Sequence, residues 1–220
     1  MKNHHSLHIE TFPIGSYACN CSLVYSSDTK ECIVIDPGND FQTLFKIIED
    51  KGLVVKQLLH THAHFDHIGE SSLLADKTGA SIHLHRGDQF LYEALAQQGQ
   101  FFGQELPDPA EVDGWLENEE TFSLDDGQLK EFLRTFHTPG HTPGSCCFYT
   151  ENLEKPLLFA GDTLFSGSIG RTDLPGGDGD LIISSIKKRL LTLPAETQVI
   201  TGHGPSTSIL KEKKSNPFLV

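Results

Sequence analysis

The sequence has few of the features that mark membrane, exported or nucleic-acid-binding proteins. No stretch approaches the roughly 18 to 20 apolar residues of a membrane span, and the opening MKNHHSLHIETF lacks the apolar core of a secretory signal. Basic residues are also scarce: 17 Lys and Arg stand against 30 Asp and Glu, for a formal net charge of -13. Such a chain repels phosphate backbones. We therefore expect no membrane partner and no nucleic-acid partner, although metal ions could make one local site positive.

Cysteine is rare, and no CxxC motif occurs. The five cysteines lie in apolar, strand-like segments: Cys19, Cys21, Cys32, Cys146 and Cys147. Because side chains alternate along a strand, Cys19 and Cys21 should share a face, and one of Cys146 and Cys147 should lie in the core. We expect buried thiols rather than disulfides, which is typical of a reducing compartment, here the cytoplasm.

The length of 220 residues, with 37% hydrophobic residues, suits one full core. We expect a single domain spanning 1–220, as a monomer or weak homo-oligomer. Apolar runs and turn signals predict strands at 6–12, 17–26, 31–35, 54–60, 81–85, 120–124, 129–137, 145–150, 156–162 and 197–203. Helical spacing predicts helices at 41–52, 68–80, 88–100 and 181–193, before a short basic tail. Strands precede helices in both halves without strict alternation, which suits an α+β fold of two packed sheets with helices outside.

The segment HTHAHFDH, residues 60–67, gathers four of the 12 histidines and an aspartate. At the end of an extended strand, His62 and His64 point to the same side. Asp66 and His67 are neighbours, so they can reach the same site only if the chain turns between 64 and 67 into a helix. Two ligand pairs at different angles suit two metal ions a few ångströms apart better than one.

Three later strands end in residues of the same kinds. His141 lies between two Pro-Gly turns in HTPGHTPGS, Asp162 ends the apolar run LLFAGD, and His203 ends VITGHGP. Strand ends are a common place for chemistry. One such residue alone is usually structural, but three of them together with the 60–67 segment predict a metal site.

These residues resemble the metallo-β-lactamase superfamily in order and spacing, over essentially the whole chain. The resemblance implies an αββα four-layer sandwich, with two mixed sheets flanked by helices and the site at one edge. It also implies two divalent metals per chain, with Asp162 as the bridging ligand. The two implied ligand sets are His62, His64 and His141 for one ion, and Asp66, His67 and His203 for the other. Imidazole and carboxylate suit Zn, and also Fe or Mn.

Within the superfamily, GDTLFSGSIGRTDLPGG and the closing GHGPST…EKKSNPF are similar to short glyoxalase II-like hydrolases. The resemblance implies hydrolysis of a thioester, foremost an S-2-hydroxyacylglutathione such as S-lactoylglutathione, by a hydroxide shared between two metals. Asp66 could orient that hydroxide besides binding metal, and Asp162 is the second expected catalytic residue. Arg171 aligns with a basic residue that grips glutathione in full-length glyoxalase II, so it is the expected substrate-binding residue.

Other activities of the same fold stay open. Persulfide dioxygenases share GRTD and use one Fe(II) on the equivalents of His62, His141 and Asp162, and lactone or ester hydrolases are a further alternative. Zinc β-lactamases place a Cys where this chain has Asp66, which disfavours antibiotic hydrolysis. A non-catalytic metal-binding protein is disfavoured because all seven expected ligands are present.

The chain also departs from full-length glyoxalase II. Asp173 and Pro205 stand where those enzymes have Tyr, and those enzymes also carry a C-terminal helical domain, which we do not expect in this single-domain chain. We therefore expect weaker or broader glutathione recognition. Two questions stay open: whether the tail lysines replace the missing contacts or form a solvated face, and whether residues 101–115 roof the pocket or form a surface insert. The tail lysines are Lys211, Lys213 and Lys214.

Several further polar residues are expected to be structural. We predict packing or supporting roles for His60, His83, His85 and His137. Asp36 in IVIDPG ends a strand, and we expect it to brace the turns of the metal site rather than to bind metal.

Overall fold

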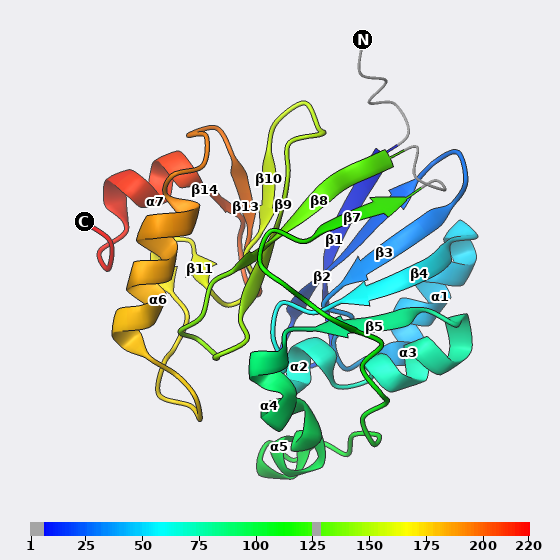
Figure 1. Cartoon of the computed structure of the whole chain (residues 1–220). Coiled ribbons are helices and arrows are strands. Elements are labelled where there is room, and N and C mark those ends of the chain that lie inside the picture. Colours follow the sequence, from blue (N-terminus) through cyan, green and yellow to red (C-terminus); the bar gives the residue numbers. More distant parts are fainter. Residues whose placement is uncertain (1–6, 125–128) are drawn as a thin grey trace.

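Two six-stranded sheets pack face to face, with helices against their outer faces (Figure 1). The structure, a computed structural model, describes residues 7–124 and 129–220. This αββα arrangement of two mixed sheets is the one expected from the sequence. No helix in these two stretches is long and apolar enough to cross a membrane.

The first sheet comes from the N-terminal half, in the order β1-β2-β3-β4-β5-β6. Its strands are β1 (Leu7–Ile14), β2 (Cys19–Ser26), β3 (Glu31–Ile35), β4 (Val54–Leu59), β5 (Ser81–Leu84) and β6 (Gly114–Trp115). Strands β1 to β3 pair antiparallel, whereas β3 to β6 pair parallel. Parallel neighbours need crossovers, and the helices α1 (Phe41–Lys51) and α3 (Ser71–Thr78) supply two of them on the outer face.

The second sheet comes from the C-terminal half, in the order β14-β13-β10-β9-β8-β7. Its strands are β7 (Thr121–Leu124), β8 (Leu129–His137), β9 (Cys146–Thr150), β10 (Leu157–Phe159), β13 (Gln198–Ile200) and β14 (Thr207–Ser208). Only β10 and β13 pair parallel among these strands. Its outer face is covered by α6 (Gly179–Ser185), by its π-helical continuation η3 (Ile186–Leu190) and by α7 (Ile209–Ser215).

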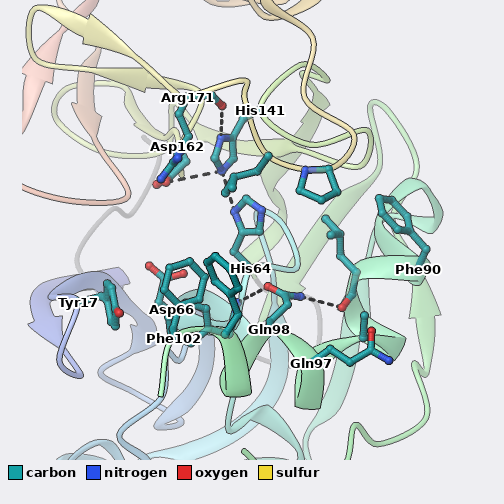
Figure 2. Close-up of a pocket in the computed structure, with 16 residues that line it drawn as sticks. Tyr17, His64, Asp66, Phe90, Gln97, Gln98, Phe102, His141, Asp162 and Arg171 are labelled. Carbon is teal, nitrogen blue, oxygen red and sulfur yellow. Dashed lines mark hydrogen bonds and ion pairs between the residues drawn. The ribbon is translucent and has the colours of Figure 1, made fainter. Parts of the chain in front are cut away.

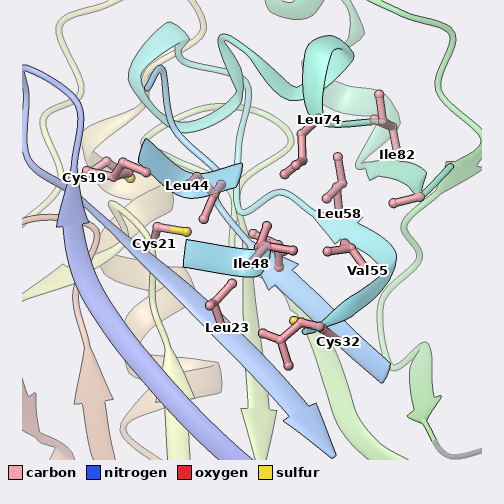
Figure 3. Packing of buried hydrophobic residues seen from close by; sticks show 14 residues of the cluster. Cys19, Cys21, Leu23, Cys32, Leu44, Ile48, Val55, Leu58, Leu74 and Ile82 are labelled. Atoms are coloured by element: carbon pink, nitrogen blue, oxygen red, sulfur yellow. The ribbon is translucent and has the colours of Figure 1, made fainter. Parts of the chain in front are cut away.

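Buried side chains fill the spaces between the four layers. One cluster joins α1 and α3 to the outer face of the first sheet, through residues such as Leu44 and Leu58 (Figure 3). A second lies between the sheets and contains Ile33 and Phe148, and a third lies beneath α6 and α7. Both faces of each sheet carry buried apolar side chains, so each sheet is covered by helices on one face and by the other sheet on the opposite face.

The cysteines are free and buried, as expected. Cys19 and Cys21 share the outer cluster of the first sheet. Cys146 faces the space between the sheets and Cys147 faces the helices. Both are therefore core residues, where we expected only one, because β9 is covered on both sides.

Three helical predictions need correction. The helix expected at 88–100 is two short helices, α4 (Gln89–Glu93) and α5 (Leu95–Phe101), which meet at Ala94. The helix expected at 68–80 begins at Ser71, because residues 65–68 form their own turn, α2 (Phe65–Ile68). The basic tail is helical as α7, which Ser208 caps by accepting from the Lys211 N–H. A short hairpin of β11 (Leu164–Phe165) and β12 (Ser168–Ile169), for which no strand was predicted, also lies in the segment GDTLFSGSIGRTDLPGG.

Candidate metal centre

The seven residues expected as metal ligands all meet at one edge of the sandwich. The first four follow β4, on its exit loop and on α2, which supplies the turn expected between 64 and 67. The other three follow strands of the second sheet: His141 after β8, Asp162 after β10 and His203 after β13. Each half of the chain thus contributes one wall of the site.

His62, His64 and His141 form the first cluster. His62 Nε2 lies 3.1 Å from His64 Nδ1 and 3.2 Å from His141 Nε2, and the remaining separation is 3.0 Å. Four-coordinate zinc with Zn–N bonds of about 2.0 to 2.1 Å requires nitrogens about 3.3 Å apart. The three nitrogens therefore fit one tetrahedral metal ion.

Asp66, His67 and His203 form the second cluster. His67 Nε2 lies 3.1 Å from His203 Nε2, and Asp66 Oδ2 lies 3.2 Å from the same His203 nitrogen. This group of one carboxylate and two imidazoles could hold a second ion.

Asp162 lies between the clusters. Its Oδ2 is 3.7 Å from His141 Nε2, and its Oδ1 is 3.4 Å from His67 Nε2. Oδ1 is buried without a hydrogen bond, and a buried orphaned carboxylate oxygen is costly. A cation at this position would satisfy it, so the residues present fit a pair of metal ions.

The charge states favour metal binding. Burial lowers the pKa of His62 well below its ordinary value and that of His64 to about 3, so these imidazoles are neutral at pH 7. Burial opposes charge on His67, but Cys19 and the nearby carboxylates, Asp162 foremost, raise its pKa well above the ordinary value. The carboxylates thus favour a positive charge in this cluster, which a divalent ion can supply.

Glycine makes room for the centre. A Cβ on Gly202 would collide with Asp162 Oδ1 and approach the His67 ring, and a Cβ on Gly170 would collide with the Asp162 carbonyl oxygen. Glycine is therefore required at positions 170 and 202, because the chain at each of these positions passes very close to Asp162.

Asp36 braces the site, as the sequence suggested. Its Oδ1 accepts from the Thr61 N–H at 2.8 Å, and its Oδ2 accepts from Thr61 Oγ1 at 2.7 Å and from His67 Nδ1 at 3.0 Å. Thr61 Oγ1 is then free to accept from His62 Nδ1 at 3.1 Å. One carboxylate therefore orients a ring in each cluster so that Nε2 faces the centre.

Main-chain carbonyls orient two further rings. His141 Nδ1 donates to the Arg171 carbonyl at 2.7 Å, and His203 Nδ1 donates to the Tyr17 carbonyl at 3.0 Å. In Figure 2, the Arg171 carbonyl is joined to the His141 ring by a dashed line. These bonds leave Nε2 of both rings free to bind metal.

Asp88 is a supporting residue that sequence reasoning missed. It is fully buried, and it accepts from the Ala63 and Gly144 N–H groups at 3.1 and 2.6 Å and from Thr142 Oγ1 at 2.7 Å. It thereby joins the loop that carries His62 and His64 to the loop that carries His141. The sequence showed only an Asp in HRGDQF at a helix start, which is a common capping position.

The histidines predicted to have packing or supporting roles make structural contacts outside the two clusters. His60 Nδ1 donates to the His83 carbonyl at 2.9 Å, and His60 Nε2 accepts from Ser71 Oγ at 2.8 Å. His85 stacks on His137 with ring centroids 3.9 Å apart, and His137 donates to the carbonyl of Pro143.

A cavity of about 450 Å³ opens onto the centre. Its floor includes His64, Asp66, His141 and Asp162. Its wall is mostly apolar and comes from Tyr17, from α4 and α5 and from the loop that follows β12 (Figure 2). Wall residues include Phe90, Leu91, Ala94, Phe101, Phe102, Leu174 and Pro175.

Gln98 fixes this wall against the centre. Its Oε1 accepts from the Phe65 N–H at 3.2 Å, and its Nε2 donates to the carbonyls of Ala63 and Leu91. Of the segment 101–115, only Phe101 and Phe102 line the cavity. The aromatic wall is therefore built by α4 and α5, whereas residues 103–115 lead away to β6.

Arg171 reaches the cavity but is not free. Its Nε and Nη2 donate to the two carboxylate oxygens of Asp173 at 2.7 and 2.8 Å, and this pair lowers the pKa of Asp173 to about 2. The tail lysines lie exposed on α7, and none of them lines the cavity. They form an exposed face of α7 outside the cavity.

Comparisons with known proteins agree with this geometry. A family model described as the metallo-beta-lactamase superfamily matches residues 14–203. The hydroxyacylglutathione hydrolase GloC of Haemophilus influenzae is 42% identical over 97% of this chain and 98% of its own. The solved structure of the B3 metallo-β-lactamase BLEG-1 superposes with a TM-score of 0.86 at 37% identity, covering 97% of this chain and 100% of that one. The di-iron-bound form of TTHA1623 gives a TM-score of 0.85 at 35% identity, with 96% and 100% covered.

Proposed function

Because the chain belongs to the metallo-β-lactamase superfamily and is a metallo-hydrolase of that fold, we propose that it hydrolyses the thioester bond of S-2-hydroxyacylglutathiones, S-lactoylglutathione among them. The likeness to a hydroxyacylglutathione hydrolase along nearly the whole chain supports this substrate class. The observation that carries the proposal is the position of Asp162, whose two oxygens face two separate groups of metal-binding side chains.

The proposed centre holds two divalent ions. His62, His64 and His141 would hold one, and Asp66, His67 and His203 would hold the other, with Asp162 shared. Zinc suits these ligands, and the di-iron form of the similar TTHA1623 supports iron as an alternative. When bound, such ions lower the pKa of a water molecule to about 7 and polarise a substrate carbonyl.

The residues of the chain position the reactants. Asp66 and Asp162 lie on the cavity floor, and the mostly apolar wall faces them across the space that a substrate would occupy. Burial disfavours the ionised form of Asp66, but His67 and His203 lower its pKa, so the carboxylate can accept a hydrogen bond from the attacking water. As the oxygen–carbon bond forms and the carbon–sulfur bond breaks, the leaving group departs as a thiolate. A thiol with a pKa of about 8.5 needs no strong general acid for this step.

Thiol release from S-D-lactoylglutathione, together with metal analysis, tests the proposal. We expect release by the wild type and at least a hundredfold loss of kcat in Asp162→Ala, which removes the oxygens facing both clusters. Metal content should also fall below two ions per chain. Asp76→Asn, at an exposed position on α3, is the matched control and should behave as wild type. Full activity of Asp162→Ala, or no thiol release by metal-loaded wild type, contradicts the proposal.

β-Lactam hydrolysis is the second candidate. The likeness to BLEG-1, a B3 metallo-β-lactamase, favours it, although Asp66 had argued against it from the sequence. Hydrolysis of a chromogenic cephalosporin, measured with the same protein preparation, would support β-lactamase activity in addition to the proposed thioesterase activity.

A further inference from the structure

The guanidinium of Arg171 is occupied by a carboxylate of the same loop. Two parallel hydrogen bonds, at 2.7 and 2.8 Å, join Arg171 to both oxygens of Asp173. This is the bidentate arrangement in which an arginine would bind a carboxylate of a substrate. The two side chains are 57% and 68% exposed, so solvent can compete for the pair.

Arg171 has no basic neighbour among the described residues that line the cavity. Among the described residues that line it, Arg171 is the one Lys or Arg side chain, and the charged residues of the floor are the acidic Asp66 and Asp162. The lining is otherwise mostly aromatic, aliphatic or amide. A glutathione thioester carries two carboxylates, and apart from the proposed metal ions the described lining offers them no Lys or Arg that is not already paired.

We propose that Asp173 is a specificity-determining residue: it competes with the substrate carboxylate for Arg171, so that the site takes thioesters of neutral thiols about as readily as those of glutathione. The inference rests on the proposed thioesterase function and names its substrate class, which is thioesters recognised through the apolar wall rather than through an anionic thiol. The apolar wall of α4 and α5 gives such substrates their contact surface.

The expected size of the effect follows from the exposure of the pair. Ion pairs between exposed side chains stabilise only weakly, so a substrate carboxylate can displace Asp173 at small cost. Removing the competitor should therefore improve glutathione recognition by about two- to fivefold. A larger effect would require a buried pair.

The test compares two substrates with the same acyl group, S-D-lactoylglutathione and neutral S-D-lactoyl-N-acetylcysteamine. In Asp173→Asn, we expect KM for the glutathione thioester to fall about two- to fivefold relative to KM for the neutral thioester. The gain should disappear in the double variant Arg171→Gln/Asp173→Asn, because it requires the released guanidinium. Asp76→Asn removes the same charge on α3, far along the chain from the loop, and should leave the ratio of the two KM values unchanged.

Each outcome decides between competition and another role. A fall in KM confined to the anionic thioester, and lost in the double variant, supports the proposal. An unchanged ratio, an equal shift for both substrates, or a rise for the glutathione thioester overturns it, since the last would mean that Asp173 positions Arg171 for the substrate. If the wild type hydrolyses neither thioester, the proposed function itself is wrong, which is a distinguishable result.

Discussion

The replacement Asp36→Asn should weaken metal binding without removing any of the expected ligands. The carboxylate of Asp36 can only accept hydrogen bonds, and it accepts three, from the N–H and Oγ1 of Thr61 and from Nδ1 of His67. These bonds place the His67 proton on Nδ1 and leave Nε2 free for a metal. An asparagine oxygen can still accept from the Thr61 N–H, but its NH2 group then faces Nδ1 of His67. The imidazole must turn Nδ1 into an acceptor, which moves the proton to Nε2 and blocks that ligand.

The magnitude follows from this change of tautomer. Loss of a partner that orients a metal-binding histidine typically costs 10- to 100-fold in affinity, or about 1.4 to 2.7 kcal/mol. The metal-free protein also loses a charge-assisted hydrogen bond, worth about 1.5 to 3 kcal/mol. The second cluster should be affected more than the first, because His67 contacts Asp36 directly, whereas His62 does so through Thr61.

Competition with a chromophoric chelator, with metal counted per chain, measures both sites. We expect one ion to bind with nearly wild-type affinity and the other 10- to 100-fold more weakly. The exposed Asp76→Asn variant controls for loss of one negative charge. Two ions bound by Asp36→Asn with wild-type affinity would refute the reasoning from the tautomer.

Two further predictions concern the stability of the metal-free protein. Asp88→Ala leaves the buried Ala63 and Gly144 N–H groups without a partner, so the free energy of unfolding should fall by about 2 to 6 kcal/mol. Urea titration measures this loss. A loss below about 0.5 kcal/mol, which is typical of an exposed position, would contradict the prediction. Burial lowers the pKa of His60 to about 4. Between about pH 4 and 6.5, the unfolded chain therefore binds a proton at this histidine that the folded protein does not bind. The free energy of unfolding should fall as the pH is lowered through this range. Urea titrations across it should show a shallower pH dependence for His60→Gln than for wild type, by up to about 3 kcal/mol in total, and identical slopes would show that His60 is not the group responsible.

Much of the fold was predictable because its strongest signals are local. The strand β8 occupies the predicted residues 129–137, since its leucines and phenylalanines recur along a nine-residue stretch that is free of Gly and Pro. The two-residue strands β6 and β14 were not predicted, because a strand of that length is defined by its partners and not by its own pattern. The helix α7 was predicted only as a basic tail, because its lysines dominate the local sequence. Its buried face is held by Glu212, whose carboxylate accepts hydrogen bonds from Thr207 Oγ1 and the Gly167 N–H.

The candidate site also has a part that was predictable from local sequence and a part that was not. The histidines and aspartates around the centre stand at strand ends in recognisable motifs, and the structure brings all seven together. Asp88 could not be identified, because its partners lie 25 residues before it and 54 to 56 after it, and no periodicity carries that information. The pairing of Arg171 was hidden for a different reason: Asp173 was visible in the sequence as a departure from the family, but which way its side chain turns depends on the path of the loop.

The two main-chain bonds to His141 and His203 bear on how such a protein can evolve. The carbonyl groups that orient these rings belong to Arg171 and Tyr17, and the side chains of both residues line the cavity. A mutation at either position exchanges the side chain and keeps the carbonyl. Substrate preference can therefore drift at two positions beside the centre while the histidines keep their orientation. In this arrangement the shape of the cavity can change at two positions without any change in the groups that orient the two histidines.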